Sequence, residues 1–369
     1  MQRRFELDSL RGLAALSVLL YHALALNSAQ LTSALSLGPV TSFWGQLLVY
    51  SPLHLLWLGG EAVWLFFVLS GFVLTRAAQR SGFSWNSYYP SRIVRLYLPV
   101  LAAVALAWLT YLYPHVLTPG MDQLLPTSYP PVNILQDVTL VGGTTTSLGV
   151  LWSLQWEVVF SLALPLYLIL GRRWPAISGV IGLTLCLAGW WYNNPATSFL
   201  PMFLLGVILA SHWERIQDLI GFLASGRVRA HVVGAIALAL VCVGLLSYYL
   251  FGPFLGPYAR VDTVPLALAA IALLICIAQV WPPLRSLLSV RPFTFLGRIS
   301  YSLYLVHLPL VVLFLFVLSR GYVSAFVAIV VALVTAVIFY FLVERPAHLL
   351  SRRVSRRLGE ERTAILESK

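Results

Sequence analysis

The sequence predicts an all-α, polytopic membrane protein with about ten transmembrane helices and both termini in the cytoplasm. The chain is 59% hydrophobic and only 10% charged over its 369 residues, a composition far outside that of soluble globular domains. Apolar stretches long enough to cross a bilayer core of about 30 Å as helices recur along it. The basic residues fall in every second connection between these stretches, which is the pattern of cytoplasmic loops.

Hydropathy places the spans in order along the chain. The fifth and sixth nearly meet at Asn193-Asn194-Pro195, so a count between eight and eleven stays open. A further apolar stretch, 43–57, is broken by Gly45 and Pro52, and we expect it to be an interfacial or re-entrant segment. The expected spans lie at about residues 10–26, 58–76, 93–113, 151–170, 175–192, 197–211, 231–250, 263–281, 298–318 and 322–343.

The basic residues test this order. All but two of the 24 Lys and Arg residues, Arg260 and Arg320, fall in segments that the order makes cytoplasmic. The long outer loops 27–57 and 114–150 contain no Lys or Arg at all. The net charge of +11 is dispersed between apolar runs, so it indicates membrane topology and not nucleic-acid binding.

The chain is expected to form one transmembrane domain over residues 1–350, followed by a basic cytoplasmic tail over 351–369. We predict a multi-pass protein of the inner (cytoplasmic) cell membrane, in contact with the lipid bilayer. Its first span is expected to be retained, because Glu6 and Asp8 precede it where a signal peptide would be purely basic. The three cysteines, Cys186, Cys242 and Cys276, lie in apolar runs, so neither a disulfide framework nor a metal site is expected.

A histidine lies inside the first span. His22 follows Arg11 by eleven residues, which is close to three helical turns, so both side chains should share one helix face about 16 Å apart. Ionisable residues within membrane spans are rare and usually face a bundle interior or a wet cavity. His22 is therefore a candidate functional residue, and a histidine that only bonds a neighbouring span is the alternative.

Other polar residues are expected at defined depths. Glu157 should lie about 9 Å from the outer end of the fourth span and His22 about 6 Å from the outer end of the first. A carboxylate at that level would orient an imidazole and make it more basic. Glu61, near the outer end of the second span, and His307, in the ninth, are further supporting candidates.

An arginine cluster is expected at the cytoplasmic end. Arg92 and Arg95 are three residues apart, so on a helix they point the same way, near where Arg11 also ends. Three guanidinium groups match the oxygens of a phosphate. Ordinary positive-inside arginines are the alternative reading.

Several stretches together resemble the acyltransferase type 3 family of integral-membrane acyltransferases. The resemblance covers essentially the whole chain and implies transfer of an acyl group, usually acetyl, from cytoplasmic acyl-CoA to a hydroxyl of an extracytoplasmic polysaccharide or glycolipid. Some members carry an extra C-terminal hydrolase-like domain, which we do not expect here, and this leaves a separate extracytoplasmic partner protein open. The matching stretches are LDSLRGLAALSVLLYH at 7–22, LFFVLSGFVL at 65–74, RIVR at 92–95, LWSLQWEVVFSLALP at 151–165, ISYSLYLVHLPL at 299–310 and VERP at 343–346.

The resemblance also implies roles for residues. Arg11, Arg92 and Arg95 would hold the phosphates of acetyl-CoA, the acyl donor, and no metal is implied. His22, oriented by Glu157, would act as a general base on the acceptor hydroxyl or first take the acyl group itself.

A proton-coupled transporter that uses His22 and Glu157 as a relay is the chief alternative function, because intramembrane ionisable residues mark such pathways too. A transporter would not need arginines aligned with one histidine. A purely structural or signalling membrane protein is a third option. Neither the acceptor hydroxyl nor the length of the acyl group follows from the residues.

Overall fold

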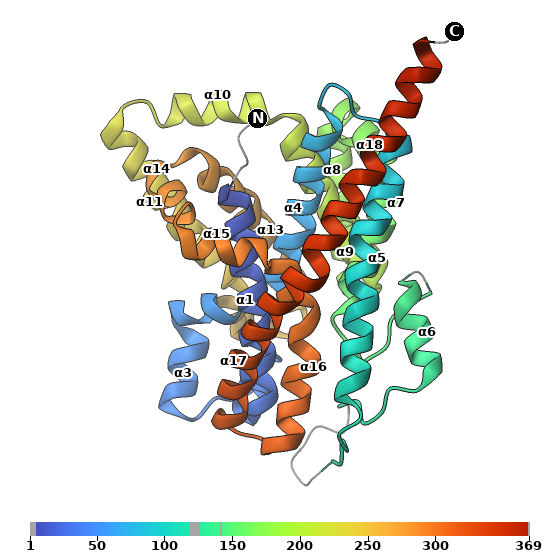
Figure 1. Cartoon of the computed structure of the whole chain (residues 1–369). Helices are drawn as coiled ribbons and strands as arrows, with labels where there is room; N and C mark the ends of the chain where they lie inside the picture. Colours follow the sequence, from blue (N-terminus) through green and yellow to red (C-terminus); the bar gives the residue numbers. More distant parts are fainter. Residues whose placement is uncertain (1–4, 118–124, 141, 368–369) are drawn as a thin grey trace. The chain divides into compact units, whose positions relative to one another are not determined.

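A computed structural model describes residues 5–117, 125–140 and 142–367 (Figure 1). Every regular element in these residues is a helix, as a lipid environment requires of a chain that must satisfy its own backbone hydrogen bonds. Within the described part, eight helical stretches are long and apolar enough to cross a membrane. The prediction of an all-α polytopic membrane protein is confirmed.

The span count differs from ten for two reasons. Helix α9 (Pro195–Ser211) is followed by α10 (Trp213–Leu223) at a bend of 70°, and the two together make a ninth stretch. Helix α8 (Pro175–Trp191) is apolar but has only 17 residues, near the lower limit for crossing a bilayer. Each of the ten predicted spans nevertheless overlaps a helix.

The chain folds as two compact units, each described by itself. Unit 1 comprises Met1–Arg76 and Val159–Ser300, and unit 2 comprises Ala77–Val158 and Tyr301–Lys369. Helix α7 (Leu151–Arg173) begins in unit 2 and ends in unit 1. The predicted domain boundary at residue 350 falls inside α18 (Arg345–Glu367).

Unit 1 holds most of the helices. Besides α8, α9 and α10 it contains α1 (Phe5–Asn27), α2 (Ala29–Ala34), α3 (Phe43–Tyr50), the 3-10 turn η1 (Pro52–Trp57), α4 (Gly60–Ala78, up to Arg76), α11 (Arg227–Leu245), α12 (Ser247–Leu255), the turn η2 (Gly256–Tyr258), α13 (Ala259–Val280), α14 (Pro282–Leu288) and α15 (Arg291–Arg298). The expected non-spanning segment 43–57 is thus formed by the short helices α3 and η1.

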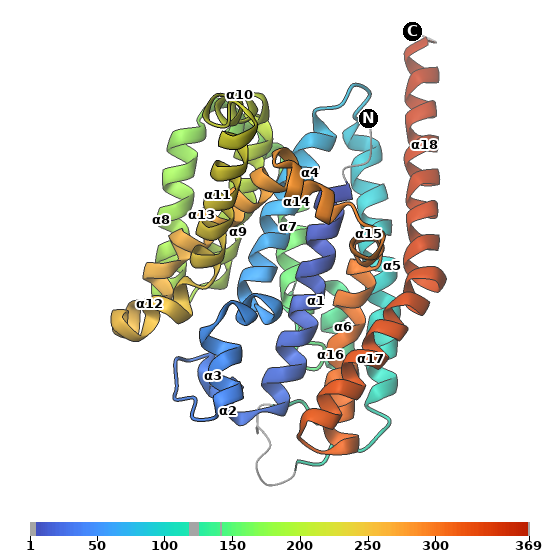
Figure 2. The same ribbon diagram turned by 90° about the vertical axis from the view of Figure 1, so that its left-hand side faces the viewer.

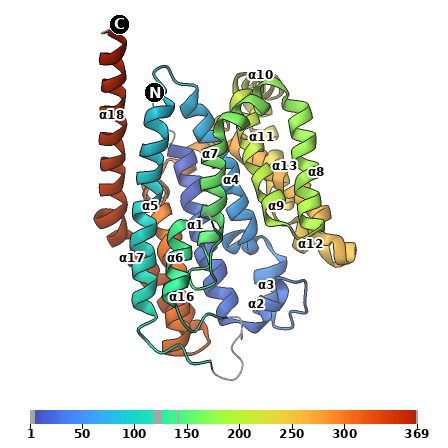
Figure 3. The same cartoon turned by 90° about the vertical axis from the view of Figure 1, so that its right-hand side faces the viewer.

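Small residues let helices of unit 1 approach closely. An added Cβ at Gly71 of α4 would overlap the backbone of Phe203 in α9, and one at Gly206 would overlap that of Val68. Close backbone contact through glycine is a common way to pack membrane helices. Helices α8 and α9 lie side by side (Figure 3).

Capping residues begin several of these helices. Ser28, Ser42 and Asn194 accept hydrogen bonds from backbone N–H groups in the first turns of α2, α3 and α9, which satisfies donors that have no partner within the helix. Proline occupies the first turn of α8, α9 and α14, where its missing N–H costs nothing.

The two ends of unit 1 carry different segments. The start of α1 lies at the same end as α10, whereas α2 and α3 lie at the opposite end (Figures 1 and 2). The sequence assigns the first of these ends to the cytoplasm and the second to the outside. The unit is therefore internally consistent with the predicted order, and its orientation in a membrane stays a prediction.

The longest contact in unit 2 joins the helices α5 (Trp85–Thr110) and α18. Besides these two helices, the unit contains α6 (Pro131–Thr139), α16 (Ser300–Leu318, from Tyr301), α17 (Tyr322–Phe339) and the π-helical turn η3 (Tyr340–Glu344). Helix α18 packs along α5 (Figure 1), and the Ser351 hydroxyl donates to the Ser91 carbonyl over 2.8 Å. The wide turn η3 precedes Pro346, whose ring would clash with the carbonyl four residues earlier in a regular α-helix.

Candidate functional site

His22 lies in the last two turns of α1 and is partly buried. Its Nδ1 is 3.0 Å from the Val18 carbonyl oxygen, one turn earlier. Because a carbonyl only accepts hydrogen bonds, Nδ1 carries the proton of the neutral ring and Nε2 is its basic nitrogen. The Tyr21 ring meets the imidazole edge to face at 5.0 Å. The ring of His22 is thus held at Nδ1 by its own helix.

The opposite end of α1 is fixed to α14 and α15. An added Cβ at Gly12, next to Arg11, would overlap the backbone of Gly297. The Ser9 hydroxyl donates to the Leu288 carbonyl over 2.6 Å, and Glu6 pairs with Arg285 at 2.7 Å. Arg11 is partly buried beside this junction. Arg11 and His22 share the uninterrupted helix α1, as the sequence predicts.

Unit 2 brings together an arginine and a glutamate that the sequence placed at different levels. Arg92 Nη2 on α5 lies 2.5 Å from Glu157 Oε1 on α7, with side chains 12% and 22% exposed. Arg95, one turn further along α5, is exposed. A charged hydrogen bond of this length in a largely buried place is strong and fixes α5 against α7.

A second carboxylate lies nearby in unit 2. Glu344, 3% exposed in η3, accepts hydrogen bonds from the backbone N–H and the hydroxyl of Ser302, at 3.0 and 2.5 Å. The Tyr301 hydroxyl donates to the Leu96 carbonyl over 3.0 Å, on the same stretch of α5 as Arg92 and Arg95. These contacts attach the start of α16 and the end of η3 to the arginine-bearing part of unit 2.

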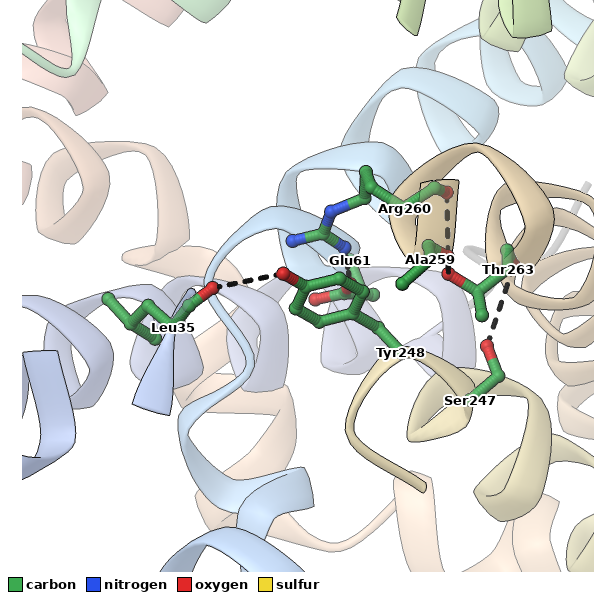
Figure 4. A network of polar contacts seen from close by, with 7 residues as sticks. All are labelled: Leu35, Glu61, Ser247, Tyr248, Ala259, Arg260 and Thr263. Atoms are coloured by element: carbon green, nitrogen blue, oxygen red, sulfur yellow. Dashed lines mark hydrogen bonds and ion pairs between the residues drawn. The ribbon is translucent and has the colours of Figure 1, made fainter. Parts of the chain in front are cut away.

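Glu61 is almost completely buried in the first turn of α4. Its Oε1 lies 2.7 Å from Arg260 Nη1 in the first turn of α13, with Glu61 only 2% exposed (Figure 4). Arg260 is one of the two basic residues outside the predicted cytoplasmic segments. The buried carboxylate gives a physical reason for a positive charge there, because an unpaired buried Glu would be strongly destabilising.

The segment around α6 of unit 2 is held by a buried acid. Asp137 accepts hydrogen bonds from the Tyr129 hydroxyl at 2.8 Å, the Thr145 backbone N–H at 2.6 Å and the Thr145 hydroxyl at 2.8 Å. Burial raises the pKa of Asp137, and the hydrogen bonds from Thr145 and Tyr129 oppose that rise. Both carboxylate oxygens of Asp137 accept hydrogen bonds from this segment, so the acid has a structural role there.

A groove of about 570 Å³ in unit 1 carries no acid–base chemistry. It is lined almost entirely by apolar residues of α7, α8 and α9 and by the turn between α7 and α8. Apolar walls without convergent polar groups suit a hydrocarbon chain better than a reacting centre.

Comparison with known proteins decides between the candidate functions. Residues 4–345 match the Acyl_transf_3 family, an acyltransferase domain. The chain belongs to this acyltransferase 3 family. The match extends from the start of α1 to the first residue of α18, and so includes the helices that carry Arg11, His22, Arg92 and Glu157.

Three curated proteins are similar to this acyltransferase 3 chain. Nodulation protein 10 of Rhizobium leguminosarum bv. viciae is 26% identical in an alignment of 250 positions that covers 58% of this chain and 62% of that protein. Acyltransferase MdmB of Streptomyces mycarofaciens is 27% identical in an alignment of 274 positions that covers 69% of each chain. The putative peptidoglycan O-acetyltransferase YrhL of Bacillus subtilis (strain 168) is 25% identical over 98% of this chain and 58% of that protein. The acyltransferase 3 chain therefore spans less than two thirds of the first and third relatives, and no solved structure matches it.

The units divide the predicted site residues of this acyltransferase 3 chain. Unit 1 holds Arg11, His22 and Glu61, and unit 2 holds the others. The orientation of His22 by Glu157, and a phosphate site shared by Arg11 with Arg92 and Arg95, therefore stay predictions. His307 is fully buried in α16, with Nδ1 3.0 Å from the Leu303 carbonyl, the same one-turn contact that His22 makes.

Two charged residues escaped the sequence analysis. Arg260 stood out only as an exception to the positive-inside pattern, and that exception was the available signal for its pairing with Glu61. Glu344 was visible as the acidic residue of VERP directly after an apolar span. Among the described residues of this acyltransferase 3 chain, no group of three or more His, Cys, Asp or Glu could hold a metal ion.

Proposed function

We propose that this membrane protein transfers an acyl group, usually acetyl, from cytoplasmic acyl-CoA to a hydroxyl of an extracytoplasmic polysaccharide or glycolipid, in the inner cell membrane. Membership of the acyltransferase 3 family supports acyl transfer, and the name of the relative YrhL supports a glycan acceptor and an acetyl group. The observation that carries the proposal is the geometry of His22. Its ring lies in a membrane helix with Nδ1 on a backbone carbonyl, so Nε2 is the nitrogen suited to accept a proton.

In direct transfer, His22 acts as a general base. Nε2 takes the proton of the acceptor hydroxyl while its oxygen attacks the thioester carbonyl carbon, and the carbon–sulfur bond then breaks. The departing coenzyme A thiolate takes the proton back from the imidazolium. The products are an O-acyl ester and coenzyme A, and the histidine is regenerated.

In the two-step route, His22 Nε2 itself attacks the thioester carbonyl carbon, the carbon–sulfur bond breaks, and the coenzyme A thiolate leaves an acyl-imidazolium that keeps its Nδ1 proton. The acceptor hydroxyl oxygen then attacks the acyl carbon, the carbon–nitrogen bond breaks, and the hydroxyl proton passes to the thiolate, which gives the same ester, coenzyme A and the neutral histidine. Both routes need the same nitrogen, and the fixed Nδ1 proton is compatible with both.

The donor phosphates are assigned to arginines. Arg95 is exposed on α5 and Arg92 lies one turn before it, and the guanidinium fork suits phosphate oxygens. Arg11, on the same face of α1 as His22 and about three turns from it, would place the donor along α1. Glu157 is proposed to position Arg92 through their ion pair, and to stabilise the imidazolium form of His22 by its charge, because Nδ1 of that ring is already bonded to the Val18 carbonyl.

The proposal is tested by His22→Ala with a matched control. His212 also has a ring nitrogen on a backbone carbonyl, Nε2 at 3.1 Å from Gly171, but has no proposed role. We expect His22→Ala to lose at least about 10²- to 10⁴-fold of acetyl transfer from labelled acetyl-CoA to envelope glycan, with expression unchanged, and His212→Ala to keep it. Full activity of His22→Ala refutes the role of His22, and ion-driven flux in liposomes without acetyl-CoA binding would favour the transporter instead.

A further inference from the structure

Arg260 and Glu61 form an ion pair in which only the arginine is accessible from outside. The Glu61 side chain is 2% exposed, whereas the Arg260 side chain is 29% exposed. The backbone of Arg260 belongs to the first turn of helix α13. In the next turn, the Thr263 hydroxyl donates to the Ala259 carbonyl over 2.7 Å (Figure 4). The guanidinium therefore keeps donor groups on its open side after pairing with the carboxylate, because an arginine has five N–H donors.

Aromatic rings surround this guanidinium. The Cζ atom of Arg260 lies 4.0 Å from the ring centroid of Tyr248, 5.5 Å from that of Trp64 and 5.7 Å from that of Trp190. Tyr248 lies directly beside the Arg260–Glu61 pair (Figure 4). These residues come from α4, α8, α12 and α13, so four helices of unit 1 converge on one charge.

A second aromatic pair continues the cluster toward solvent or lipid. The rings of Trp191 and Tyr258 are stacked at 4.5 Å with planes 5° apart, and the residues are 53% and 50% exposed. Trp191 follows Trp190 directly, and Tyr258 precedes Arg260 by two residues. An exposed stacked pair therefore lies next in sequence to two members of the cluster, Trp190 and Arg260.

The cluster also reaches His22. The Tyr21 ring occupies the space beside Gly59, where an added Cβ would overlap it. Gly59 precedes Glu61 by two residues, and the Tyr21 ring also meets the His22 ring edge to face at 5.0 Å. A single side chain therefore separates the surroundings of the charge pair from the proposed catalytic base, all within unit 1.

We infer that Arg260 and the partly exposed rings of Trp190 and Tyr248 form the acceptor subsite, supported from below by the buried Glu61 and Trp64, and that its ligand is a hydroxyl-rich sugar ring. This inference rests on the proposed function. Planar charged groups present paired donors and acceptors to neighbouring hydroxyls, while aromatic faces cover the C–H face of a sugar. Binding sites combine apolar walls with a few fixed polar groups in this way.

Two simpler explanations cover only part of the cluster. A structural lock between α4 and α13 explains the ion pair, but it does not require three rings around the arginine. Interfacial aromatic belts explain exposed Trp and Tyr, but belt residues face the headgroups and need not enclose a guanidinium. A sugar subsite accounts for the half-open charge pair, the enclosing rings and the path to His22 together.

The test compares Trp190→Leu and Arg260→Lys with a matched control. Arg173 lies over the Trp174 ring at 5.5 Å, so Trp174→Leu removes a similar contact elsewhere in unit 1. The full-length proteins are placed in lipid nanodiscs with labelled acetyl-CoA and with cell-envelope glycan extracted from a source strain that lacks the gene. The KM for glycan, the KM for acetyl-CoA, acetyl-CoA binding and the thermal midpoint are measured for each protein.

We expect the glycan KM to rise about tenfold in both subsite variants, as a loss of about 1.4 kcal/mol gives, with acetyl-CoA binding and the control unchanged. Unchanged glycan KM in both variants overturns the subsite. An equal loss of donor binding and thermal stability also overturns it, in favour of a structural lock. If the wild-type protein binds acetyl-CoA but labels no glycan, the proposed acceptor class fails and the subsite with it. Glycan labelling by the wild type together with unchanged variants refutes the subsite alone.

Discussion

Replacing Arg92 and Arg95 singly with Lys separates donor binding from membrane topology. Both changes keep the positive charge, so topology should survive. Arg95 is exposed on α5, and a Lys there cannot reproduce the guanidinium fork on a phosphate. We expect Arg95→Lys to cost about 1–2 kcal/mol, roughly five- to thirtyfold in acetyl-CoA affinity, with little effect on stability.

Arg92→Lys should behave differently because of Glu157. The Arg92–Glu157 contact at 2.5 Å joins α5 to α7, and both side chains are mostly buried. A hydrogen bond between charged groups contributes about 1.5–3 kcal/mol, and a Lys retains the charge but loses part of that geometry. We expect the variant to lose thermal stability as well as donor affinity, and Glu157→Gln to reproduce the stability loss.

The assay is acetyl-CoA binding by titration calorimetry in nanodiscs, with thermal unfolding followed by tryptophan fluorescence. Arg172→Lys, at an exposed position of α7 that is predicted to be cytoplasmic, is the matched control and should change neither quantity. His22→Ala should still bind the donor. Unchanged affinity in both Arg92→Lys and Arg95→Lys would refute donor binding, and an equal loss in Arg172→Lys would show that the effect is not local.

Three further predictions concern topology, pH and packing. Reporter fusions at Asn194 should give an extracytoplasmic signal and those at Arg173 a cytoplasmic one, and the reverse pattern would contradict the span order. Burial lowers the pKa of His54 in η1, so the unfolded chain takes up a proton more readily, and stability should fall as the pH drops below about 6.5; a difference in thermal midpoint between wild type and His54→Phe that stays the same across that pH would contradict this. Gly297→Leu should destabilise by at least about 1–3 kcal/mol, because the added atoms would overlap the Asp8 backbone; an unchanged denaturation midpoint would argue against that contact.

The helices were predictable because apolar length and basic connections are local properties. The first span, its Arg11-to-His22 spacing and the non-spanning segment 43–57 follow from residues close together in sequence. The position of Arg260 in the sequence was also unusual, because it lies outside the predicted cytoplasmic segments that contain almost all other basic residues. Local sequence therefore predicts which helices exist and which polar residues they carry.

Partners distant in sequence were not predictable. Arg92 and Glu157 are 65 positions apart, and Arg260 and Glu61 are 199 positions apart, so only the packing of α5 on α7 and of α4 near α13 creates these pairs. Glu157 was predicted to face His22 from its depth alone, and depth does not fix the direction of a side chain around its helix. The turn η3 also escaped, because no residue pattern distinguishes a π-helical turn from the α-helix around it.

The contact between His22 Nδ1 and the Val18 carbonyl has a consequence for mutagenesis. The group that orients the ring belongs to the main chain, so no side-chain replacement at position 18 deletes it, and an alanine scan would pass over it. Replacing the amide bond between Val18 and Leu19 with an ester would weaken that carbonyl as an acceptor and leave every side chain intact. A backbone substitution of this kind, and not a side-chain mutation, is therefore needed to test how the His22 ring is oriented.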